Sequence, residues 1–161
     1  MSIHNLTVAE RKGAGRQAAV PAKSFDHHTA WHGEYVQSVP DENILHDIAA
    51  AMRRAGYTQH DILAVRLSVE EALVNAYSHG NGRDTTKCIK VCCKVSRRRV
   101  RAQIEDEGQG FDPESVPDPS LPENLDKIHG RGLALMRKFM TQVRFNRRGN
   151  KVTLSKNRAQ A

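Results

Sequence analysis

The sequence predicts an α+β fold, a two-layer sandwich in which a mostly antiparallel, mixed sheet is covered on one face by helices. Strand-like segments come in runs, and three helical patterns are gathered between those runs, an order that favours this layout. The length of 161 residues suits one domain that buries a real core. Aromatic residues make up only 5% of the chain, so that core must consist mostly of Leu, Ile, Val, Ala and Met.

The first element is expected at residues 31–39, where apolar and polar residues alternate loosely, as in a strand, up to Pro40. Asp41 is a good N-cap, so a helix is predicted to begin directly after it. The apolar positions of this helix continue to Met52, and Gly56 closes it.

A second, longer helix is predicted to begin at Thr58. Its apolar residues recur with a period near 3.6, which indicates an amphipathic helix; they are Ile62, Val65, Val69, Ala72, Leu73 and Ala76. Two strands follow at 86–95 and 100–105, joined by a basic turn at 96–99.

Residues 112–129 contain four prolines and therefore cannot form a regular helix or a central strand. A loop of this length in a compact domain is usually functional or mobile. A helix at 131–140 and two strands at 142–146 and 151–155 complete the predicted fold, and the chain has no internal repeat.

Residues 1–23 are expected to form a flexible basic leader, and residues 24–158 the domain itself. The leader has no continuous apolar stretch of the kind that secretory signals carry. No apolar run in the chain approaches the roughly 18–20 residues that a membrane span needs. We therefore expect a cytoplasmic protein without membrane contact.

Three cysteines, Cys88, Cys92 and Cys93, lie on one predicted strand. Adjacent strand residues point to opposite faces, so Cys92 and Cys93 are poorly placed for a disulfide. The C-x-x-C spacing typical of metal sites is absent. Buried, reduced thiols are the favoured interpretation.

Three short motifs whose residue types suit a binding or catalytic site follow one another in a fixed order. In the first, Glu71 and Asn75 are i and i+4 on the second predicted helix, so both side chains leave the same helix face. Taken alone, such a pair is most often a solvated polar face. Glu70 is the competing carboxylate, but it points about 100° away, and the spacing to Asn75 favours Glu71.

The second motif, residues 106–111, places Asp106 at the end of the strand 100–105. A carboxylate aimed into a pocket at that point can accept a hydrogen bond from an exocyclic amine. Gly108 and Gly110 permit positive φ and a close backbone approach to a ligand. The alternative is an ordinary turn, in which aspartate and glycine are common.

The third motif joins Gly130, Arg131 and Gly132 at the start of a predicted helix. Free backbone N–H groups at a helix N-terminus bind phosphates, glycine lets a triphosphate come close, and Arg131 adds positive charge. The alternative is a flexible junction between loop and helix.

In this order and spacing the three motifs resemble the ATP pocket of the GHKL ATPase/kinase superfamily, whose domain is called the Bergerat fold. The resemblance runs from Ser24 to Arg158 and is closest at residues 67–80 and 130–136. Within the superfamily the chain is most similar to the small anti-sigma-factor serine/threonine kinases. Those proteins bind a sigma factor, phosphorylate a small anti-anti-sigma (STAS-type) partner and form homodimers, and we expect the same here.

The resemblance also implies cofactors and residue roles. Glu71 would accept the proton of the attacking hydroxyl, Asn75 would ligate Mg²⁺ through its amide oxygen, and Asp106 would hydrogen-bond to the adenine amine of ATP. The remaining residues expected to contact the nucleotide are Gly108, Gly110, Gly130, Arg131, Gly132 and Asn150.

The chain departs from the family pattern in two places. Relatives have a Gly-Thr-Thr-Val-like run beside the adenine, where residues 149–153 here read Gly-Asn-Lys-Val-Thr. Asn150 can still hydrogen-bond to the nucleotide, whereas Lys151 is unexpected. Residues 126–129 lack an arginine that some relatives have. If that arginine aids phosphoryl transfer, either Lys127 or Arg131 substitutes for it or catalysis is weak.

Two alternative functions stay open at this stage. One is an ATP-gated protein-binding switch without phosphoryl transfer. The other is a basic nucleic-acid-binding module, because the net charge is +7 and arginines are frequent in the second half of the chain. No recognition helix or aromatic platform accompanies these arginines. Several of them, Arg97 to Arg99 among them, fall at predicted turns, so a solvated edge or an acidic protein partner is favoured over nucleic acid.

Overall fold

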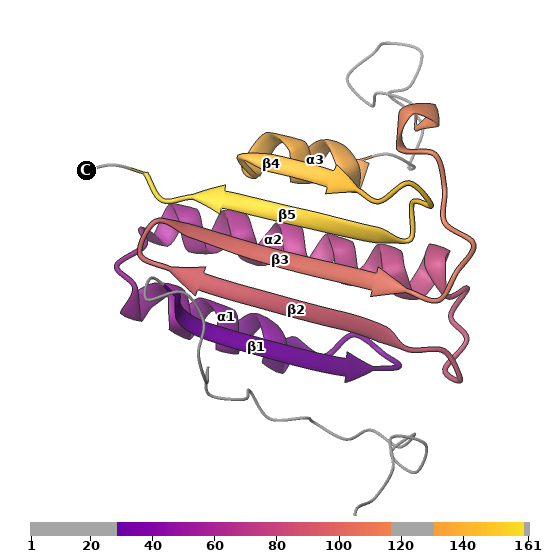
Figure 1. Cartoon of the computed structure of the whole chain (residues 1–161), viewed down its shortest axis with the longest axis horizontal. Helices are drawn as coiled ribbons and strands as arrows, with labels where there is room; N and C mark the ends of the chain where they lie inside the picture. Colours follow the sequence, from indigo (N-terminus) through magenta and orange to yellow (C-terminus); the bar gives the residue numbers. More distant parts are fainter. Residues whose placement is uncertain (1–28, 117–130, 160–161) are drawn as a thin grey trace, which may run out of the picture.

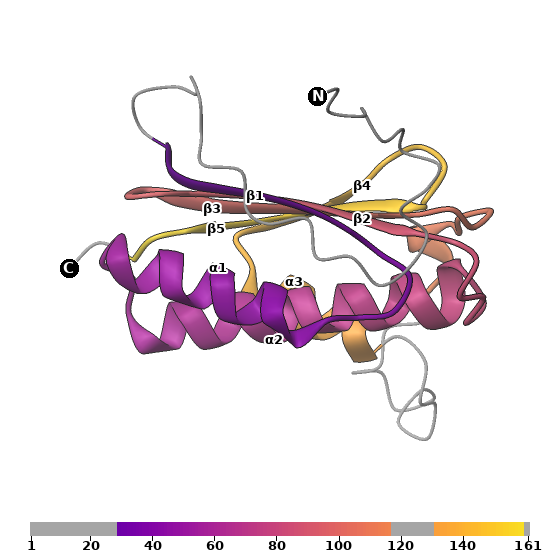
Figure 2. The ribbon, with the colours of Figure 1, turned by 90° about the horizontal axis from the view of Figure 1, so that it is seen from below.

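The computed structural model describes residues 29–116 and 131–159, which form one sheet with helices on one of its faces (Figures 1 and 2). The strand order is β1-β2-β3-β5-β4. The strands are β1 (Thr29–Gln37), β2 (Ile89–Ser96), β3 (Arg99–Asp106), β4 (Gln142–Phe145) and β5 (Lys151–Asn157). The helices are α1 (Glu42–Arg54), α2 (Gln59–Asn75) and α3 (Arg131–Phe139), with a π-helix η2 (Ala76–Gly80) and a 3₁₀ turn η3 (Pro113–Ser115).

The predicted α+β sandwich is confirmed, and every strand pairing among the described residues is antiparallel. β2 and β3 form a local hairpin, whereas α1 and α2 are inserted between the paired strands β1 and β2. At the other side, β5 pairs with both β3 and β4, so it lies inside the sheet and β4 forms the edge. Figure 2 shows the three α-helices on one face of this sheet.

The predicted N-cap of α1 is present, and Thr58, the predicted start of the second helix, is the N-cap of α2. The Asp41 carboxylate accepts the backbone N–H of Asn43 at 2.9 Å, and the Thr58 hydroxyl accepts that of Asp61 at 3.1 Å. These contacts satisfy N–H groups that have no partner within the helix. After α1, Gly56 takes the positive φ of +81° that lets the chain reverse into α2.

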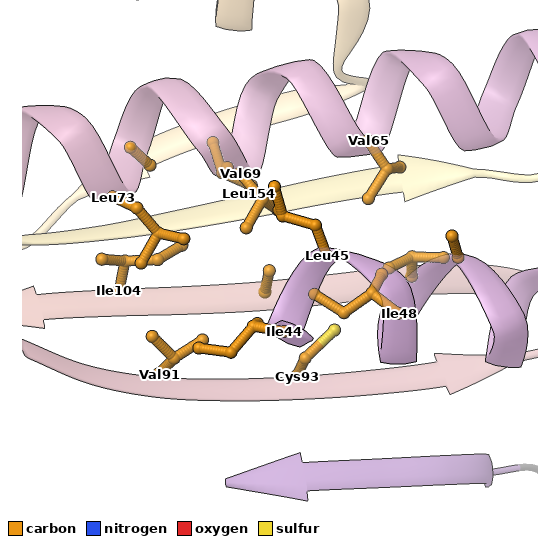
Figure 3. Close-up of a cluster of buried hydrophobic side chains, with 14 of the residues drawn as sticks. Ile44, Leu45, Ile48, Val65, Val69, Leu73, Val91, Cys93, Ile104 and Leu154 are labelled. Atoms are coloured by element: carbon orange, nitrogen blue, oxygen red, sulfur yellow. The ribbon is translucent and has the colours of Figure 1, made fainter. Parts of the chain in front are cut away.

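The core lies between the helices and the inner face of the sheet (Figure 3). Every residue of the predicted α2 stripe is buried there, because a period of 3.6 keeps these positions on one side of the helix. The side chains labelled in Figure 3 are Ile44, Leu45, Ile48, Val65, Val69, Leu73, Val91, Cys93, Ile104 and Leu154.

The second strand begins later than the sequence predicts. The predicted strand 86–95 starts at Ile89, because Thr86 belongs to a turn. The Asp84 carboxylate accepts the backbone N–H of Thr86 at 2.9 Å and its hydroxyl at 2.6 Å. Such a local side-chain bond competes with strand pairing.

Several expectations fall on residues outside the described ranges. These are the leader 1–23, most of the loop 112–129 and Gly130. Within the described residues, none of the helices combines the length and the apolar character needed to cross a bilayer.

Two leucines of α2 provide a matched test of this core. Leu73 is 2% exposed and Leu63 is 54% exposed. We expect Leu73→Ala to lower the free energy of unfolding by about 2–5 kcal/mol, because it leaves a cavity, and Leu63→Ala to change it by less than about 0.5 kcal/mol. Urea denaturation measures both values, and equal losses would contradict the described packing of α2.

Candidate functional site

The second half of α2 presents the first pair of predicted site residues. Glu71 and Asn75 are both half-buried, whereas Glu70 is exposed. The side chains of Glu71 and Asn75 therefore point toward other residues of the protein and not into open solvent. This arrangement agrees with the choice of Glu71 over Glu70 as the site carboxylate.

The neighbour of this pair is Gly132, in the first turn of α3. A Cβ added to Gly132 would collide with the Glu71 carboxylate and would lie 3.4 Å from the Asn75 amide nitrogen. The backbone of the α3 N-terminus is thus in close contact with both side chains. Because the first N–H groups of a helix lack intrahelical partners, a carboxylate, an amide and anion-binding N–H groups meet at one place.

Arg131 begins α3 and is exposed, at the edge of this meeting point. Gly130, which the sequence places directly before it, lies outside the described residues. The role of both in holding phosphate stays a prediction.

The predicted adenine-reading residue, Asp106, is the last residue of β3. Its carboxylate accepts the backbone N–H of Gly108 at 2.8 Å. A Cβ on Gly80, the last residue of η2, would collide with the same carboxylate. Asp106 therefore lies directly against the end of the α2–η2 segment.

Burial raises the pKa of the Asp106 carboxyl above its ordinary value, while the hydrogen bond from Gly108 favours the charged form and lowers it. A carboxylate held in a partly dehydrated place makes stronger hydrogen bonds than one in bulk water. This environment suits the recognition of a polar ligand group.

The two glycines of the second motif are required for different structural reasons. A Cβ on Gly108 would collide with the carbonyl oxygen of Gly80, so Gly108 permits close backbone contact. Gly110 has a φ of +83°, a conformation that L side chains rarely adopt, and its backbone lies against the carbonyl oxygen of Arg148.

Asn150 is buried beside Asp106 and its amide is engaged with protein atoms. Its Nδ2 donates to the Asp106 carbonyl at 2.7 Å, and its Oδ1 accepts from the Asn146 amide at 2.9 Å. The Asn150 carbonyl also accepts the Asp106 N–H at 3.0 Å. Asn150 thus fixes the end of β3, and direct contact with a nucleotide stays a prediction.

Lys151, the unexpected residue of this segment, points away from the helices. It pairs with Glu105 in the β3–β5 ladder, and its ammonium group lies 2.8 Å from the Glu105 carboxylate. The next residue, Val152, is buried on the helix side. Lys151 is therefore compatible with the site, because the alternation of the strand puts it on the other face.

Sequence reasoning missed the contribution of the segment that follows Asn75. After Asn75 the chain continues as the π-helix η2 through Gly80, whose φ is not positive. Gly80 is needed for contact with Asp106. Asn81 is 1% exposed, donates to the Cys88 carbonyl at 3.1 Å and accepts the Glu107 N–H at 2.9 Å. The signal was the uninterrupted likeness of residues 67–80 to one family segment.

The site has two ends, joined by one helical segment. At one end Glu71 and Asn75 face the start of α3, and at the other Gly80 faces Asp106 and Gly108. Between Glu71 and Gly80 a helix rises by roughly 13 Å. An arrangement of this kind can hold an elongated ligand with a polar heterocycle at one end and an anionic group at the other.

The arginines of the predicted basic turn lie away from this site. Arg97, Arg98 and Arg99 are exposed at the β2–β3 turn. Arg158 donates to the carbonyl oxygens of Ala55 and Arg97 at 3.1 and 3.3 Å, so it ties the C-terminal segment to the fold.

The class of protein follows from a family comparison. The family described as histidine kinase-like ATPase domain matches residues 41–156, which is most of the chain and includes both ends of the site. The chain belongs to this family.

The chain is also similar to individual proteins whose names are more specific than that of the family. A protein named serine/threonine-protein kinase BtrW, from Bordetella bronchiseptica, is 35% identical over 97 residues, which are 58% of this chain and 68% of the relative. A protein named anti-sigma F factor, from Clostridium novyi, is 27% identical over 99 residues, 60% of this chain and 69% of the relative.

A solved structure supports the fold. The crystal structure of the RsbU and RsbW domains of a Mycobacterium tuberculosis protein superposes with a TM-score of 0.54 and 16% identity. The match covers 81% of this chain but 33% of that one, so the chain spans about a third of the larger protein. At this level of identity the likeness shows the fold, which is the Bergerat-type sandwich that the sequence predicts.

Two glycine substitutions test the close contacts of the site. We expect Gly108→Ala to lower the free energy of unfolding by about 1–3 kcal/mol, because the new methyl group meets a backbone carbonyl that cannot move aside. Gly132→Ala meets the end of a flexible glutamate side chain and gains about 1 kcal/mol of helix propensity, so its loss is smaller. Urea denaturation of the two variants gives the comparison, and a larger loss for Gly132→Ala would contradict the described contacts.

Proposed function

We propose that this protein is an ATP-dependent serine/threonine protein kinase of the anti-sigma type. It binds ATP with Mg²⁺ and transfers the γ-phosphoryl group to a hydroxyl of a small anti-anti-sigma (STAS-type) protein. The observation that carries this proposal is the contact of Glu71 and Asn75 with the N-terminus of α3, in a chain of the histidine kinase-like ATPase family. The names of its relatives, a serine/threonine-protein kinase and an anti-sigma factor, support the same activity.

The phosphate end of the site is suited to phosphoryl transfer. Glu71 is half-buried next to the α3 N-terminus, where it can take the proton of the attacking hydroxyl as that oxygen bonds to the γ-phosphorus and ADP departs. The α3 N–H groups and Arg131 balance the charge of the phosphates. Because little covalent chemistry falls to the protein, positioning and charge neutralisation account for most of the catalysis.

Asn75 is the residue that would hold Mg²⁺. Its amide oxygen is a neutral, hard ligand, and Mg²⁺ usually takes one or two protein oxygens and fills its other positions with water and phosphate oxygens. Within the described residues, the half-buried place of Asn75 beside Gly132 fits that donor set. The ion, when bound, offsets the charge that develops on the phosphates.

The other end of the site is suited to adenine. The Asp106 carboxylate already accepts one N–H from Gly108 and has further lone pairs for the exocyclic amine of adenine. Guanine presents an oxygen at the corresponding position, which the carboxylate repels. Gly80 and Gly108, which have no side chain, let the base lie close to the backbone.

The proposed partners follow from the same assignment. The kinase binds a sigma factor and phosphorylates the anti-anti-sigma protein. We further propose that it acts in the cytoplasm as a homodimer. The STAS-type substrate is tested by the phosphoryl-transfer experiment below.

The neighbouring glutamates provide a test of the chemical step. We expect Glu71→Gln to reduce phosphoryl transfer by about 10²–10⁴-fold, the usual contribution of a general base, with less than about threefold change in ATP affinity. Glu70→Gln is the matched control, and its rate should equal that of the wild type because Glu70 is exposed. Transfer of label from γ-phosphate-labelled ATP to a set of purified STAS-domain proteins measures the rate.

Two outcomes would contradict this assignment. If Glu71→Gln transfers phosphate as fast as the wild type, Glu71 is not the base. If the wild type binds ATP but leaves it intact with every STAS-domain protein, the ATP-gated switch replaces the kinase.

Base selection is tested by Asp106→Asn. The amide keeps an oxygen for Gly108 but turns a donor toward the adenine amine, so we expect ATP affinity to fall by about 10–100-fold, while GTP affinity falls less. Burial raises the pKa of the Asp106 carboxyl, so ionisation above that pKa opposes folding. The melting temperature of Asp106→Asn at pH 7 should therefore be no lower than that of the wild type. Calorimetric titration with Mg·ATP and Mg·GTP gives the affinities, and unchanged ATP binding in a folded variant would remove Asp106 from the base pocket.

A further inference from the structure

The face of the sheet opposite the helices carries a cluster of metal-ligating side chains that the proposed kinase activity does not use. It consists of His32 and Glu34 on β1 and Cys92 on β2, and we call it the outer-face cluster. Figure 2 shows that the α-helices lie on the other side of these strands. The cluster is therefore separated from Glu71, Asn75 and the other nucleotide-site residues by the thickness of the sheet.

The strand register brings these three residues together. His32 and Glu34 are two residues apart on β1, so their side chains leave the same face. Glu34 is paired directly with Cys92 on the antiparallel neighbour β2. Cys93, the next residue, is fully buried on the helix side, which confirms that Cys92 points outward.

The two separations that involve His32 are close to those of ligands around one small ion. His32 Nε2 lies 3.2 Å from a Glu34 carboxylate oxygen and 3.4 Å from Cys92 Sγ, and all three ligand atoms lie within 4.8 Å of one another. For tetrahedral zinc, bonds of about 2.0–2.1 Å to nitrogen and oxygen and 2.3 Å to sulfur require N···O and N···S separations of about 3.4 and 3.6 Å.

One atom is common to both contacts of the cluster. His32 Nε2 faces the Glu34 carboxylate and the Cys92 sulfur. The lone pair of a neutral imidazole nitrogen can bind a cation, as can the carboxylate and the deprotonated thiol. A cation between the three atoms would replace these contacts with three metal–ligand bonds.

We propose that His32, Glu34 and Cys92 bind a zinc ion on the outer face of the sheet. Imidazole nitrogen, thiolate sulfur and carboxylate oxygen are all ordinary zinc ligands, and the thiolate disfavours magnesium or calcium. The His32 side chain is 7% exposed and Glu34 is 63% exposed, so the ring is fixed by the fold while the carboxylate side is open. Water takes the fourth position.

Burial and the neighbouring charges determine how readily Cys92 gives up its proton to bind a metal ion. Burial raises the pKa of the Cys92 thiol and Glu34 acts in the same direction, whereas the positive charges of Lys94, Arg101 and Lys151 oppose this rise. Zinc releases the thiol proton when it binds. The thiolate and the Glu34 carboxylate then offset the charge of the ion.

The bound ion would join an edge strand to its neighbour. Among the described strands, β1 lies at the edge of the sheet and pairs with β2 alone. A link from two β1 side chains to one β2 side chain stabilises this pairing, since any ligand that binds only the folded state raises its stability.

Cobalt and zinc titrations of the reduced full-length protein test the site. Co²⁺ bound to a thiolate gives a ligand-to-metal charge-transfer absorption, and this readout excludes binding to histidines elsewhere in the chain. We expect one Co²⁺ per chain with this band, displaced by one equivalent of Zn²⁺. Cys92→Ser should abolish the band and lower zinc affinity at least tenfold, and Glu34→Gln, at an exposed position, should lower the affinity without affecting folding.

Cys88→Ser is the matched control, because Cys88 is a half-buried free cysteine outside the cluster. Its band and affinity should equal those of the wild type, and Asn75→Ala should bind zinc normally because the nucleotide site is on the other face. The proposal is overturned if the wild type shows no thiolate–cobalt band, if the band survives in Cys92→Ser, or if Cys88→Ser removes it. Since each variant is judged by metal binding, failure of the kinase proposal leaves this test unaffected.

Discussion

The contact of Gly80 with the Asp106 carboxylate is the constraint on which the rest of the site depends. It joins the end of the α2–η2 segment to the end of β3, and it requires a residue without a side chain at Gly80. Gly108 then lies on the Gly80 carbonyl, and Asn150 holds the Asp106 backbone from the other side. Because α2 is also fixed to the sheet by its buried apolar stripe, this contact determines where Glu71 must lie.

The regular elements were predictable because their signals are local. The stripe of α2, with Val69 and Leu73 on its buried side, follows from the period of the helix, and the caps Asp41 and Thr58 follow from their hydrogen-bonding chemistry. The position of Glu71 and Asn75 on one side of α2 was predictable for the same reason, since both lie on one helix.

What the sequence did not predict depends on contacts between distant segments. The packing of Gly80 on Asp106 joins residues on a helix and a strand, and nothing in the local pattern distinguishes Gly80 from an ordinary helix end. The orientation of Lys151 depends on the β3–β5 register. The outer-face cluster joins residues of two strands 60 positions apart, so the spacing of the cysteines could not reveal it.

The two faces of the sheet thus carry different chemistry. The helix side holds a site with a carboxylate and close glycine contacts at each of its two ends. The opposite side holds the outer-face cluster of His32, Glu34 and Cys92. The nucleotide is proposed to occupy the helix side, and amide chemical shifts of the isotope-labelled protein during titration with Mg·ATP will show whether it does. We expect the amides of Gly80, Gly108 and Gly132 to shift together with one affinity while those of β1 do not. Shifts confined to β1 and the outer face of the sheet would contradict it.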